Sequence, residues 1–431
     1  MASPRVILIS IDGLAGFYWS DPRAAMPNLR ALAERGVLAR RMETVFPSTT
    51  WPSHASLVTG LAPARHGVVA NYILNRETQR PEDLTGDPVY DAADLFRAPT
   101  IHDVARAAGL RTAAIDWPGT RHAHSLDFNL PFFKDQAIFE NHTATAVWKE
   151  LVSLGYPVDR MGEWAQQPKR FLKDAMVGDL AAHVLIRYAP DLLLIHFLCT
   201  DSFQHLHGPR SPEAYWAIEY VDGLIGRLFA RLPDADRTAV FVVSDHGFLP
   251  VEREIRPNVR LRRLGALAVA SDGQIDRATA RFVMNSGAGS LYVLDRADPV
   301  ATARDLAAEL RTLEGVANVW TSEDYGALGL PTPDGNHWMG DALLEAATGY
   351  VFMDDVAEPE EVGPTRRYRG THGQLPSHPD NGAFFLAAGA GIRRGLELPT
   401  ISNLNVAPTI ALRLGLRMES TAGRALTEIL A

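Results

Sequence analysis

Short apolar runs alternate with longer helical segments along most of this chain, and this alternation restricts the fold more than any other feature. The runs are partly β-branched, as is typical of strands buried on both faces. They are residues 6–11, 112–115, 191–197, 238–243 and 383–388. The predicted helices are residues 26–35, 100–108, 174–188, 212–232 and 406–414. The alternation predicts an α/β fold in which helices cover both faces of a mostly parallel central sheet.

The pattern changes between Glu254 and Arg369. This stretch contains a strand-like run, an Ala-, Leu- and Arg-rich helix, a second strand-like run and a turn-rich segment, at residues 290–294, 300–313, 317–321 and 331–335. Such a mixture is typical of a small α+β unit. We therefore expect a core of residues 1–253 and 370–431, with residues 254–369 inserted as an α+β cap.

Composition excludes several classes of protein. With 46% hydrophobic residues and a net charge of −9, the chain is not disordered overall, and it lacks the excess of Lys and Arg that a nucleic-acid-coating surface needs. The single Cys199 excludes an internal disulfide and an all-Cys zinc site, and we expect it to be a small buried side chain.

Export and membrane insertion are not expected. No apolar stretch approaches the ~20 residues of a membrane span. The first apolar run meets Asp12 before the apolar part of an export signal could be completed. These features predict a cytoplasmic protein without a membrane partner.

Acidic residues follow three of the predicted strands. Asp12 comes directly after the run 6–11, Asp201 lies just beyond 192–199, and Asp245 with His246 follows 240–244. Ligands of open α/β sheets bind at the carboxyl ends of the strands, although Asp and Gly at such places often only form a turn. Three acidic strand ends, two with histidine close by, favour a ligand site.

The types and spacing of these residues suit a metal site. Asp201 and His205 are four residues apart, so a helix over 200–206 places both on one face, although this spacing alone also occurs in residues that cap a helix or face water. Asp245 and His246 are adjacent, and a sharp turn can direct them toward two ions. Mixed oxygen and nitrogen ligands suit zinc, with manganese or another divalent cation possible.

A fourth element is the segment 46–54, which reads FPSTTWPSH. Three of its hydroxyls, those of Ser48, Thr49 and Thr50, precede a predicted helix, whose amino end can hold a phosphate group. Taken alone, a Ser or Thr here is more often an N-cap than a nucleophile.

The order of these motifs resembles that of the alkaline phosphatase superfamily, and most closely its nucleotide pyrophosphatase/phosphodiesterase branch. The resemblance extends over nearly the whole chain. The motifs that carry it are ISIDG at 9–13, the segment 46–54, TGL-x-P-x-x-HG at 59–67, residues 201–209, DHG at 245–247 and GTHG at 370–373.

The resemblance implies an alkaline phosphatase-like fold with the cap as its insert, and a site with two zinc ions. It assigns one ion to Asp201, His205 and His372. The other ion would bind Asp12, Asp245 and His246. Thr50 would be the nucleophile and touch the second ion, and Asn71 with the backbone N–H of Trp51 would bind a phosphoryl oxygen. His378 competes with His372 for the last ligand position, and the His-Gly context favours His372.

Two departures from the family pattern concern the substrate. Trp51 supplies one aromatic for stacking on a nucleotide base, but the second position is His196 where relatives carry tyrosine. Gln204 gives a Gln-His pair like that of phosphonoacetate hydrolase, a sister branch that holds its substrate carboxylate with lysines. The four lysines of this chain all lie between Lys134 and Lys173.

We therefore expect a two-metal phosphodiesterase or nucleotide pyrophosphatase that acts on a small phosphoester or nucleotide through a covalent phosphothreonine at Thr50. Neither the modified Cys or Ser motif of sulfatases nor the serine nucleophile of classical alkaline phosphatases is present. The alternatives are a phosphonate hydrolase with the same core, a phosphomonoesterase, and a protein that binds a phosphorylated ligand without hydrolysing it. The sequence leaves the oligomeric state open.

Overall fold

The computed structural model describes residues 4–86, 90–295 and 297–431. Its largest sheet is built of β1 (Arg5–Ile11), β2 (Gly36–Glu43), β5 (Thr112–Trp117), β6 (Phe128–Pro131), β7 (Leu192–Phe197), β8 (Thr238–Val243), β19 (Phe385–Gly389) and β20 (Leu396–Ser402). The strand order is β20-β2-β19-β8-β1-β7-β5-β6. Neighbouring strands are parallel, except that β19 is antiparallel to both β2 and β8.

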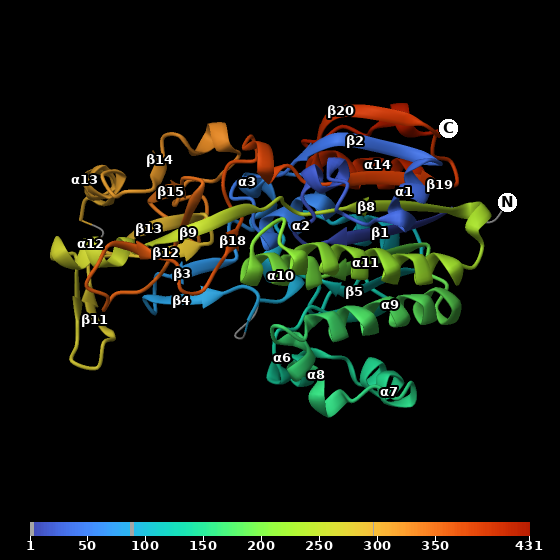
Figure 1. The fold of residues 1–431 in the computed structure, drawn as a ribbon, viewed down its shortest axis with the longest axis horizontal. Helices are drawn as coiled ribbons and strands as arrows, with labels where there is room; N and C mark the ends of the chain where they lie inside the picture. Colours follow the sequence, from blue (N-terminus) through green and yellow to red (C-terminus); the bar gives the residue numbers. More distant parts are fainter. Residues whose placement is uncertain (1–3, 87–89, 296) are drawn as a thin grey trace.

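Helices cover both faces of this sheet, so the predicted α/β fold class is confirmed (Figure 1). One face packs against α1 (Pro27–Ala33), α9 (Arg170–Arg187) and α11 (Pro212–Ala230). The other packs against α2 (Thr50–Thr59), α5 (Ile101–Ala107) and α14 (Val406–Arg413). Within β1, Ile7 and Ile9 belong to the first core while Val6 and Leu8 belong to the second, because successive side chains of a strand point to opposite faces.

The five apolar runs form β1, β5, β7, β8 and β19, each within two residues of its predicted bounds. Three strands of the sheet had no such signal. Two of them, β6 and β20, are its edge strands, and β2 and β20 contain exposed residues, so their sequences do not form continuous apolar runs.

A second group of small sheets lies beside the main sheet, on the left in Figure 1. It is built around β12 (Ala280–Asn285), β13 (Ala288–Val293), β15 (Ala342–Ala346) and β14 (Val316–Thr321), in the order β12-β13-β15-β14. The other strands and helices here are β9 (Leu249–Ile255), β10 (Leu267–Val269), β11 (Ile275–Ala278), β16 (Gly349–Phe352), β17 (Val362–Pro364), β18 (Gly370–Thr371), α12 (Pro257–Arg263) and α13 (Pro299–Arg311). The predicted strands near 290 and 317 and the helix near 300 are all present as β13, β14 and α13.

The expected cap boundaries fall within this region and stay a prediction. β9 begins at Leu249 and pairs with β16, β17 and β18, so the chain enters this region before residue 254. The N-terminal half adds the hairpin of β3 (Tyr72–Asn75) and β4 (Arg80–Asp83), which packs against β12.

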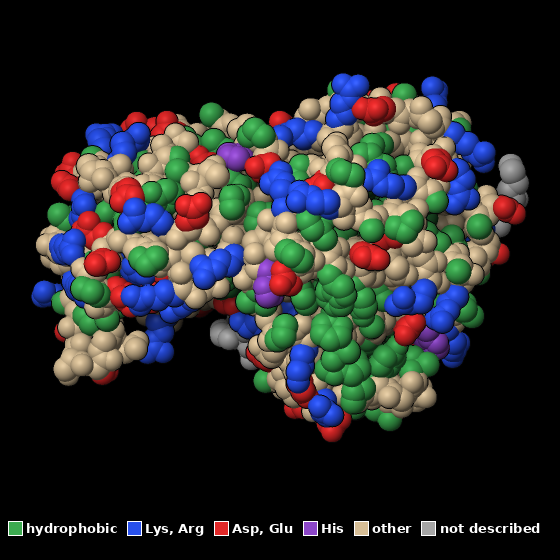
Figure 2. Space-filling model, viewed as in Figure 1, with side chains coloured by type: hydrophobic (Ala, Val, Ile, Leu, Met, Phe, Trp, Pro, Cys, Tyr) green, Lys and Arg blue, Asp and Glu red, His purple; other side chains and the backbone are tan. Residues whose placement is uncertain are grey.

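The remaining helices are α3 (Pro63–His66), α4 (Ala92–Leu95), α6 (Gln136–His142), α7 (Thr145–Ser153), α8 (Met161–Ala165) and α10 (Cys199–His207). Three of these, α6, α7 and α8, lie together at the bottom of Figure 1. On the face drawn in Figure 2, Lys and Arg are interspersed with Asp and Glu, and an apolar patch lies over the region of α8, α9 and α11. No helix of the described residues is long and apolar enough to cross a membrane.

Candidate active site

The predicted ligands meet at the carboxyl ends of three neighbouring strands. Asp12 follows β1, Asp245 and His246 follow β8, and α10, which begins just beyond β7, carries Asp201 and His205. Parallel strands that lie side by side, in the order β8-β1-β7, bring these ends together. The sixth ligand, His372, comes from far along the chain, directly after β18.

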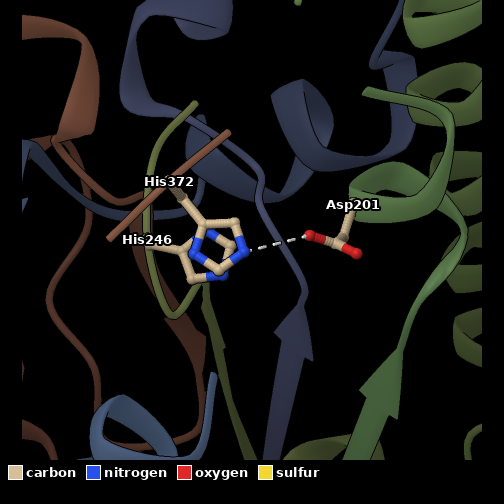
Figure 3. Close-up of side chains that lie close together, drawn as sticks. All are labelled: Asp201, His246 and His372. Carbon is tan, nitrogen blue, oxygen red and sulfur yellow. Dashed lines mark ion pairs between the residues drawn. The ribbon is translucent and has the colours of Figure 1, made fainter. Parts of the chain in front are cut away.

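Five of the six predicted ligands, all of them buried, therefore form one cluster. Ligand atoms of Asp12, Asp245 and His246 all lie within 4.8 Å of one another, which matches one predicted set. Asp201, His246 and His372 form a second group at the same spacing. Figure 3 shows the rings of His246 and His372 stacked, with centroids 3.6 Å apart, and the Nε2 of His372 facing Asp201 across 3.8 Å.

His205 lies at the outer side of the cluster. Its Nε2 is 3.2 Å from Oδ1 of Asp201, and its ring centroid is 5.1 Å from that of His372. The resemblance assigns Asp201, His205 and His372 to one ion. The distances between ligand atoms instead place His246, in addition to His372, close to Asp201. The division of the ligands between two ions therefore stays a proposal.

The backbone orients all three histidines in the same way. The Nδ1 atoms of His205, His246 and His372 lie 2.9, 3.1 and 3.0 Å from the carbonyl oxygens of Gly370, Gly247 and Ser48, respectively. A carbonyl only accepts, so each Nδ1 carries the proton and donates, and each Nε2 is left with a lone pair. Metal-binding histidines are typically held in this way.

Several buried polar atoms of the cluster make no hydrogen bond within the described part of the chain and face one another instead, as Nε2 of His246 faces Oδ2 of Asp245 at 3.1 Å. Oδ1 of Asp12, Oδ1 of Asp201, Oδ2 of Asp245 and Nε2 of His246 have no hydrogen-bond partner among the described residues. Burial, together with the charges of Asp245 and Asp201, raises the pKa of Asp12 well above its ordinary value. Buried carboxylates and imidazole nitrogens of this kind fit divalent cations, which satisfy such lone pairs and offset the negative charge.

A tight turn holds Asp12 and Asp245 next to each other. Gly13 has φ +67°, and its N–H donates to Oδ1 of Asp245 at 3.0 Å. A Cβ at Gly13 would lie 2.9 Å from the ring of Phe248, so the space and the backbone conformation both require glycine. This explains the Asp-Gly pair at the end of β1.

Thr50 lies beside the cluster at the first position of α2. It lines a cavity of about 390 Å³ together with Asp12, Asp201, His205 and His372. The preceding Thr49 is the N-cap residue, but its side chain makes no capping bond, and its buried Oγ1 has no partner among the described residues. Hydroxyl capping therefore does not account for this segment.

Trp51 and Asn71 line the same cavity and are bonded to each other. The Trp51 N–H donates to Oδ1 of Asn71 at 2.8 Å. The two groups predicted to bind one phosphoryl oxygen are therefore paired in this structure. The amide Nδ2 of Asn71 is the donor that this bond leaves for a ligand.

Comparisons with known proteins show the family of this chain. The family model described as Type I phosphodiesterase / nucleotide pyrophosphatase matches residues 6–375. This chain belongs to that family. Its members hydrolyse nucleotide and phosphoester substrates, so the chain is a member of a hydrolase family whose typical site holds two metal ions.

Individual relatives are distant. Human ectonucleotide pyrophosphatase/phosphodiesterase family member 1 is 25% identical over 248 residues, which cover 57% of this chain and only 24% of that protein. The Xenopus laevis protein named bis(5'-adenosyl)-triphosphatase enpp4 is 24% identical over 98% of this chain and 80% of its own length. Murine ectonucleotide pyrophosphatase/phosphodiesterase 5 has a TM-score of 0.72 at 19% identity, covering 99% of this chain and 100% of that one. At this identity the likeness shows the shared fold.

Within this phosphodiesterase fold, His196 does not have the predicted position. Its side chain is fully buried, and its Nε2 lies 3.1 Å from Oδ2 of Asp12 while its Nδ1 lies 3.0 Å from the carbonyl oxygen of Asp116. It is not among the described residues that line the cavity. Stacking on a nucleotide base is therefore the wrong role for His196, because the strand that carries it points this side chain behind Asp12.

The lysines divide into different surroundings. Lys134 lines the cavity, where it contacts Asp83. Lys173 is fully buried behind the cavity wall, with Nζ 2.7 Å from Asp116 and over the rings of Phe132 and Phe133. Of the four lysines between residues 134 and 173, Lys134 is the one that lines the cavity and could contact a substrate carboxylate.

Sequence reasoning missed Arg170, a cavity cation at the start of α9. Its guanidinium donates to Oγ of Ser202 at 2.8 Å and lies 4.0 Å from Oδ2 of Asp201. Phe132 and Tyr72, which also line the cavity, were missed as well. None of the three belongs to a motif, and only the fold places them near the cluster.

Of the other histidines, His54 lies directly behind the ligand set, with Nδ1 3.7 Å from Oδ2 of Asp245. His378 bonds Thr348 Oγ1 near the surface at 2.9 Å, so His372 is the residue of that segment that reaches the cluster. His54 and His66 are buried and bond backbone groups, as expected of structural residues, whereas His207 is exposed on the last turn of α10. Cys199 is buried as predicted, although it begins α10 and does not lie in the strand before it.

Proposed function

We propose that this chain is a two-metal phosphodiesterase or nucleotide pyrophosphatase with a covalent phosphothreonine intermediate at Thr50. The observation that carries the proposal is the convergence of one hydroxyl and six ligand side chains beyond the ends of β1, β7 and β8, where four of the six ligands line one cavity together with the hydroxyl. Thr50 lines that cavity at the amino end of α2, beside Asp12, Asp201, His205 and His372. Helix amino ends stabilise anions such as phosphate.

Two divalent cations, with zinc as the best match to the ligands, would be held by two carboxylate-histidine sets. We propose Asp201, His205 and His372 for one ion and Asp12, Asp245 and His246 for the other. When bound, they would lower the pKa of the Thr50 hydroxyl and offset the charge that develops on the phosphoryl group.

The remaining steps follow from the chain's own residues. Oγ1 of Thr50 loses its proton to solvent and attacks phosphorus, and the bond from phosphorus to the leaving-group oxygen breaks with its electron pair on that oxygen. A water molecule then hydrolyses the phosphothreonine and restores Thr50. Nδ2 of Asn71 donates a hydrogen bond to a phosphoryl oxygen in both steps, as an oxyanion-hole donor does.

Nucleotides are the first substrate class we propose. Trp51 presents an indole at the cavity, with its ring 4.9 Å from that of Phe132 and nearly perpendicular to it. Among the relatives, the Xenopus laevis protein is named for a bis(5'-adenosyl)-triphosphatase activity, and one structure of the murine protein is a complex with AMP. Both names support a nucleotide diester or anhydride.

A phosphonate that carries a carboxylate is the second candidate. Lys134 and Arg170 both line the cavity, and two cations there suit a substrate with a second anionic group. Attack of Thr50 on phosphorus would then break a carbon–phosphorus bond with its electron pair left on carbon, which takes up a proton from water.

The proposal can be tested with four substrates and protein loaded with zinc or manganese. They are a bis-aryl phosphodiester, an aryl nucleotide diester, an aryl phosphomonoester and phosphonoacetate. Turnover of the two diesters above the monoester supports a phosphodiesterase. Turnover of phosphonoacetate alone would replace it with a phosphonate hydrolase, and no turnover of any of them by metal-loaded protein would identify a binding protein.

A further inference from the structure

The turn between β12 and β13, residues 285–288, reaches from the second group of sheets to the candidate active site. Asn285, the last residue of β12, is 2% exposed. Its Oδ1 accepts the N–H groups of Asn71 at 3.0 Å and of Tyr72 at 2.9 Å. Its Nδ2 donates to the carbonyl oxygen of Tyr72 at 2.8 Å. Three hydrogen bonds therefore fix the backbone at residues 71–72.

Asn71 is held from both sides as a result. Its backbone is bonded to Asn285, and its side-chain Oδ1 accepts the N–H of Trp51 in the first turn of α2. An amide that is fixed at its backbone and at one terminal atom has few orientations left. The direction of Nδ2 of Asn71 is therefore set in part from β12, more than 200 residues away along the chain.

The same turn contacts the cluster of predicted metal ligands at His372. The N–H of Gly287 donates to the carbonyl oxygen of His372 at 2.6 Å. Gly373, the next residue, has φ +105°, and a Cβ there would lie 2.7 Å from the carbonyl oxygen of Asn285. The two segments thus pack backbone against backbone.

The turn is also tied to its own part of the molecule. The carbonyl oxygen of Ser286 accepts the N–H of Phe352 at 3.1 Å, and that of Gly287 accepts the N–H of Ala346 at 2.8 Å. Ser286 lines the cavity. The turn 285–288 is therefore bonded on one side to the second group of sheets and on the other side to the candidate active site.

We propose that Asn285 is a positioning residue for phosphoryl binding, and that it acts through Asn71. The region of β12 and β13 then takes part in catalysis by orienting a donor as well as by lining the cavity. This inference rests on the phosphoryl-binding role proposed for Asn71. Buried groups that orient a binding side chain typically affect activity strongly without touching the substrate.

Asn258 in α12 offers a matched control. It is fully buried, its Oδ1 accepts the N–H of Phe282 at 2.9 Å, and its Nδ2 donates to the carbonyl oxygens of Phe282 at 2.9 Å and Asp354 at 3.3 Å. It thus makes the same kinds of bond as Asn285 in the same region. It is not among the described residues that line the cavity.

The experiment compares Asn285→Ala with Asn258→Ala by urea unfolding and by steady-state kinetics on the bis-aryl diester. Both should lose stability to a similar extent. Only Asn285→Ala should lower kcat/KM strongly, by about 10–100-fold, with Asn258→Ala within about 3-fold of wild type. Equal kcat/KM values for the two variants would overturn the proposal.

A double-variant cycle tests whether Asn285 acts through Asn71. If it does, Asn285→Ala in an Asn71→Ala background should change kcat/KM by less than about 3-fold, because the group it orients is already gone. If the two single effects multiply, Asn285 acts independently of Asn71 and the proposal is wrong.

Binding of inorganic phosphate separates this inference from the proposed function. Calorimetry on metal-loaded protein should show that Asn285→Ala and Asn71→Ala weaken phosphate binding by similar factors while Asn258→Ala does not. This result supports the positioning role even if wild type hydrolyses none of the four substrates. Unchanged phosphate affinity in Asn285→Ala would reject that role even if wild type is an active diesterase.

Discussion

Nε2 of His196 lies 3.1 Å from Oδ2 of Asp12, and the Nδ1 of the same ring lies 3.0 Å from the carbonyl oxygen of Asp116. The imidazole therefore fills the space between a candidate metal ligand and the neighbouring strand β5. A side chain in this position packs against Asp12 from behind and does not reach the cavity where a substrate base would lie.

His196→Ala should lower kcat/KM by about 10–100-fold, because Asp12 loses the buried ring that packs against it and holds its place. The loss should be the same for an aryl nucleotide diester and for a bis-aryl diester without a base. Steady-state kinetics on both substrates measure the ratio of the wild-type kcat/KM to that of His196→Ala. A loss confined to the nucleotide substrate would show that His196 contacts the base after all.

Thr50→Ala should abolish turnover, because the variant lacks the attacking hydroxyl. It should still bind metal, because all six proposed Asp and His ligands are unchanged. Thr50→Ser keeps a hydroxyl and should retain measurable activity. Substrate assays paired with elemental analysis test both variants. Wild-type turnover by Thr50→Ala would show that another group is the nucleophile.

His205→Ala and Asp201→Asn should each reduce the metal content of the purified protein, measured by elemental analysis. His207→Ala is the matched control, because His207 lies on the same helix but is exposed, 3.8 Å from Glu213. Its metal content should equal that of wild type. Unchanged stoichiometry in His205→Ala would remove His205 from the ligand set.

Lys173→Met should lower the free energy of unfolding by about 3–5 kcal/mol, because it leaves the buried carboxylate of Asp116 without its cation. Adding Asp116→Asn should recover part of this loss. Lys169→Met is the control, since Lys169 is half exposed and its loss should cost less than about 0.5 kcal/mol. Urea unfolding measures all four proteins, and an equal effect of the two lysine substitutions would contradict the prediction.

His66 should make the fold sensitive to acid. Burial lowers the pKa of His66 to about 3, whereas in the unfolded chain it is about 6.5. Between these values the unfolded chain takes up a proton that the folded protein does not. The stability that the neutral His66 contributes is therefore present above about pH 6.5 and is lost as the pH falls toward 3, by up to about 1.4 kcal/mol per unit.

Wild type is compared with His66→Gln. This variant keeps a polar side chain near Ser56 Oγ and the Val68 N–H but does not titrate. Urea unfolding at pH 7.5, 5.5 and 4.5 should show wild type losing stability faster than the variant. Parallel pH profiles would mean that His66 is protonated in the folded protein.

The sequence by itself predicted the elements whose residues carry a local signal. The strands β1, β7 and β8 are buried on both faces and so read as continuous apolar runs, and the metal chemistry needs Asp and His directly at their ends. The edge strand β20 lacked this signal because half-exposed residues interrupt its apolar pattern.

Tertiary structure alone decided the surroundings of those residues. Nothing near His196 in the chain indicates that it faces Asp12, and nothing near Arg170 or Asn285 indicates that they reach the cavity or Asn71. The residue types at strand ends follow from their chemistry and can be recognised one segment at a time. Which side chain lies behind a ligand and which lines the cavity depends on how segments hundreds of residues apart pack together, because direction and distance in space are properties of the folded chain.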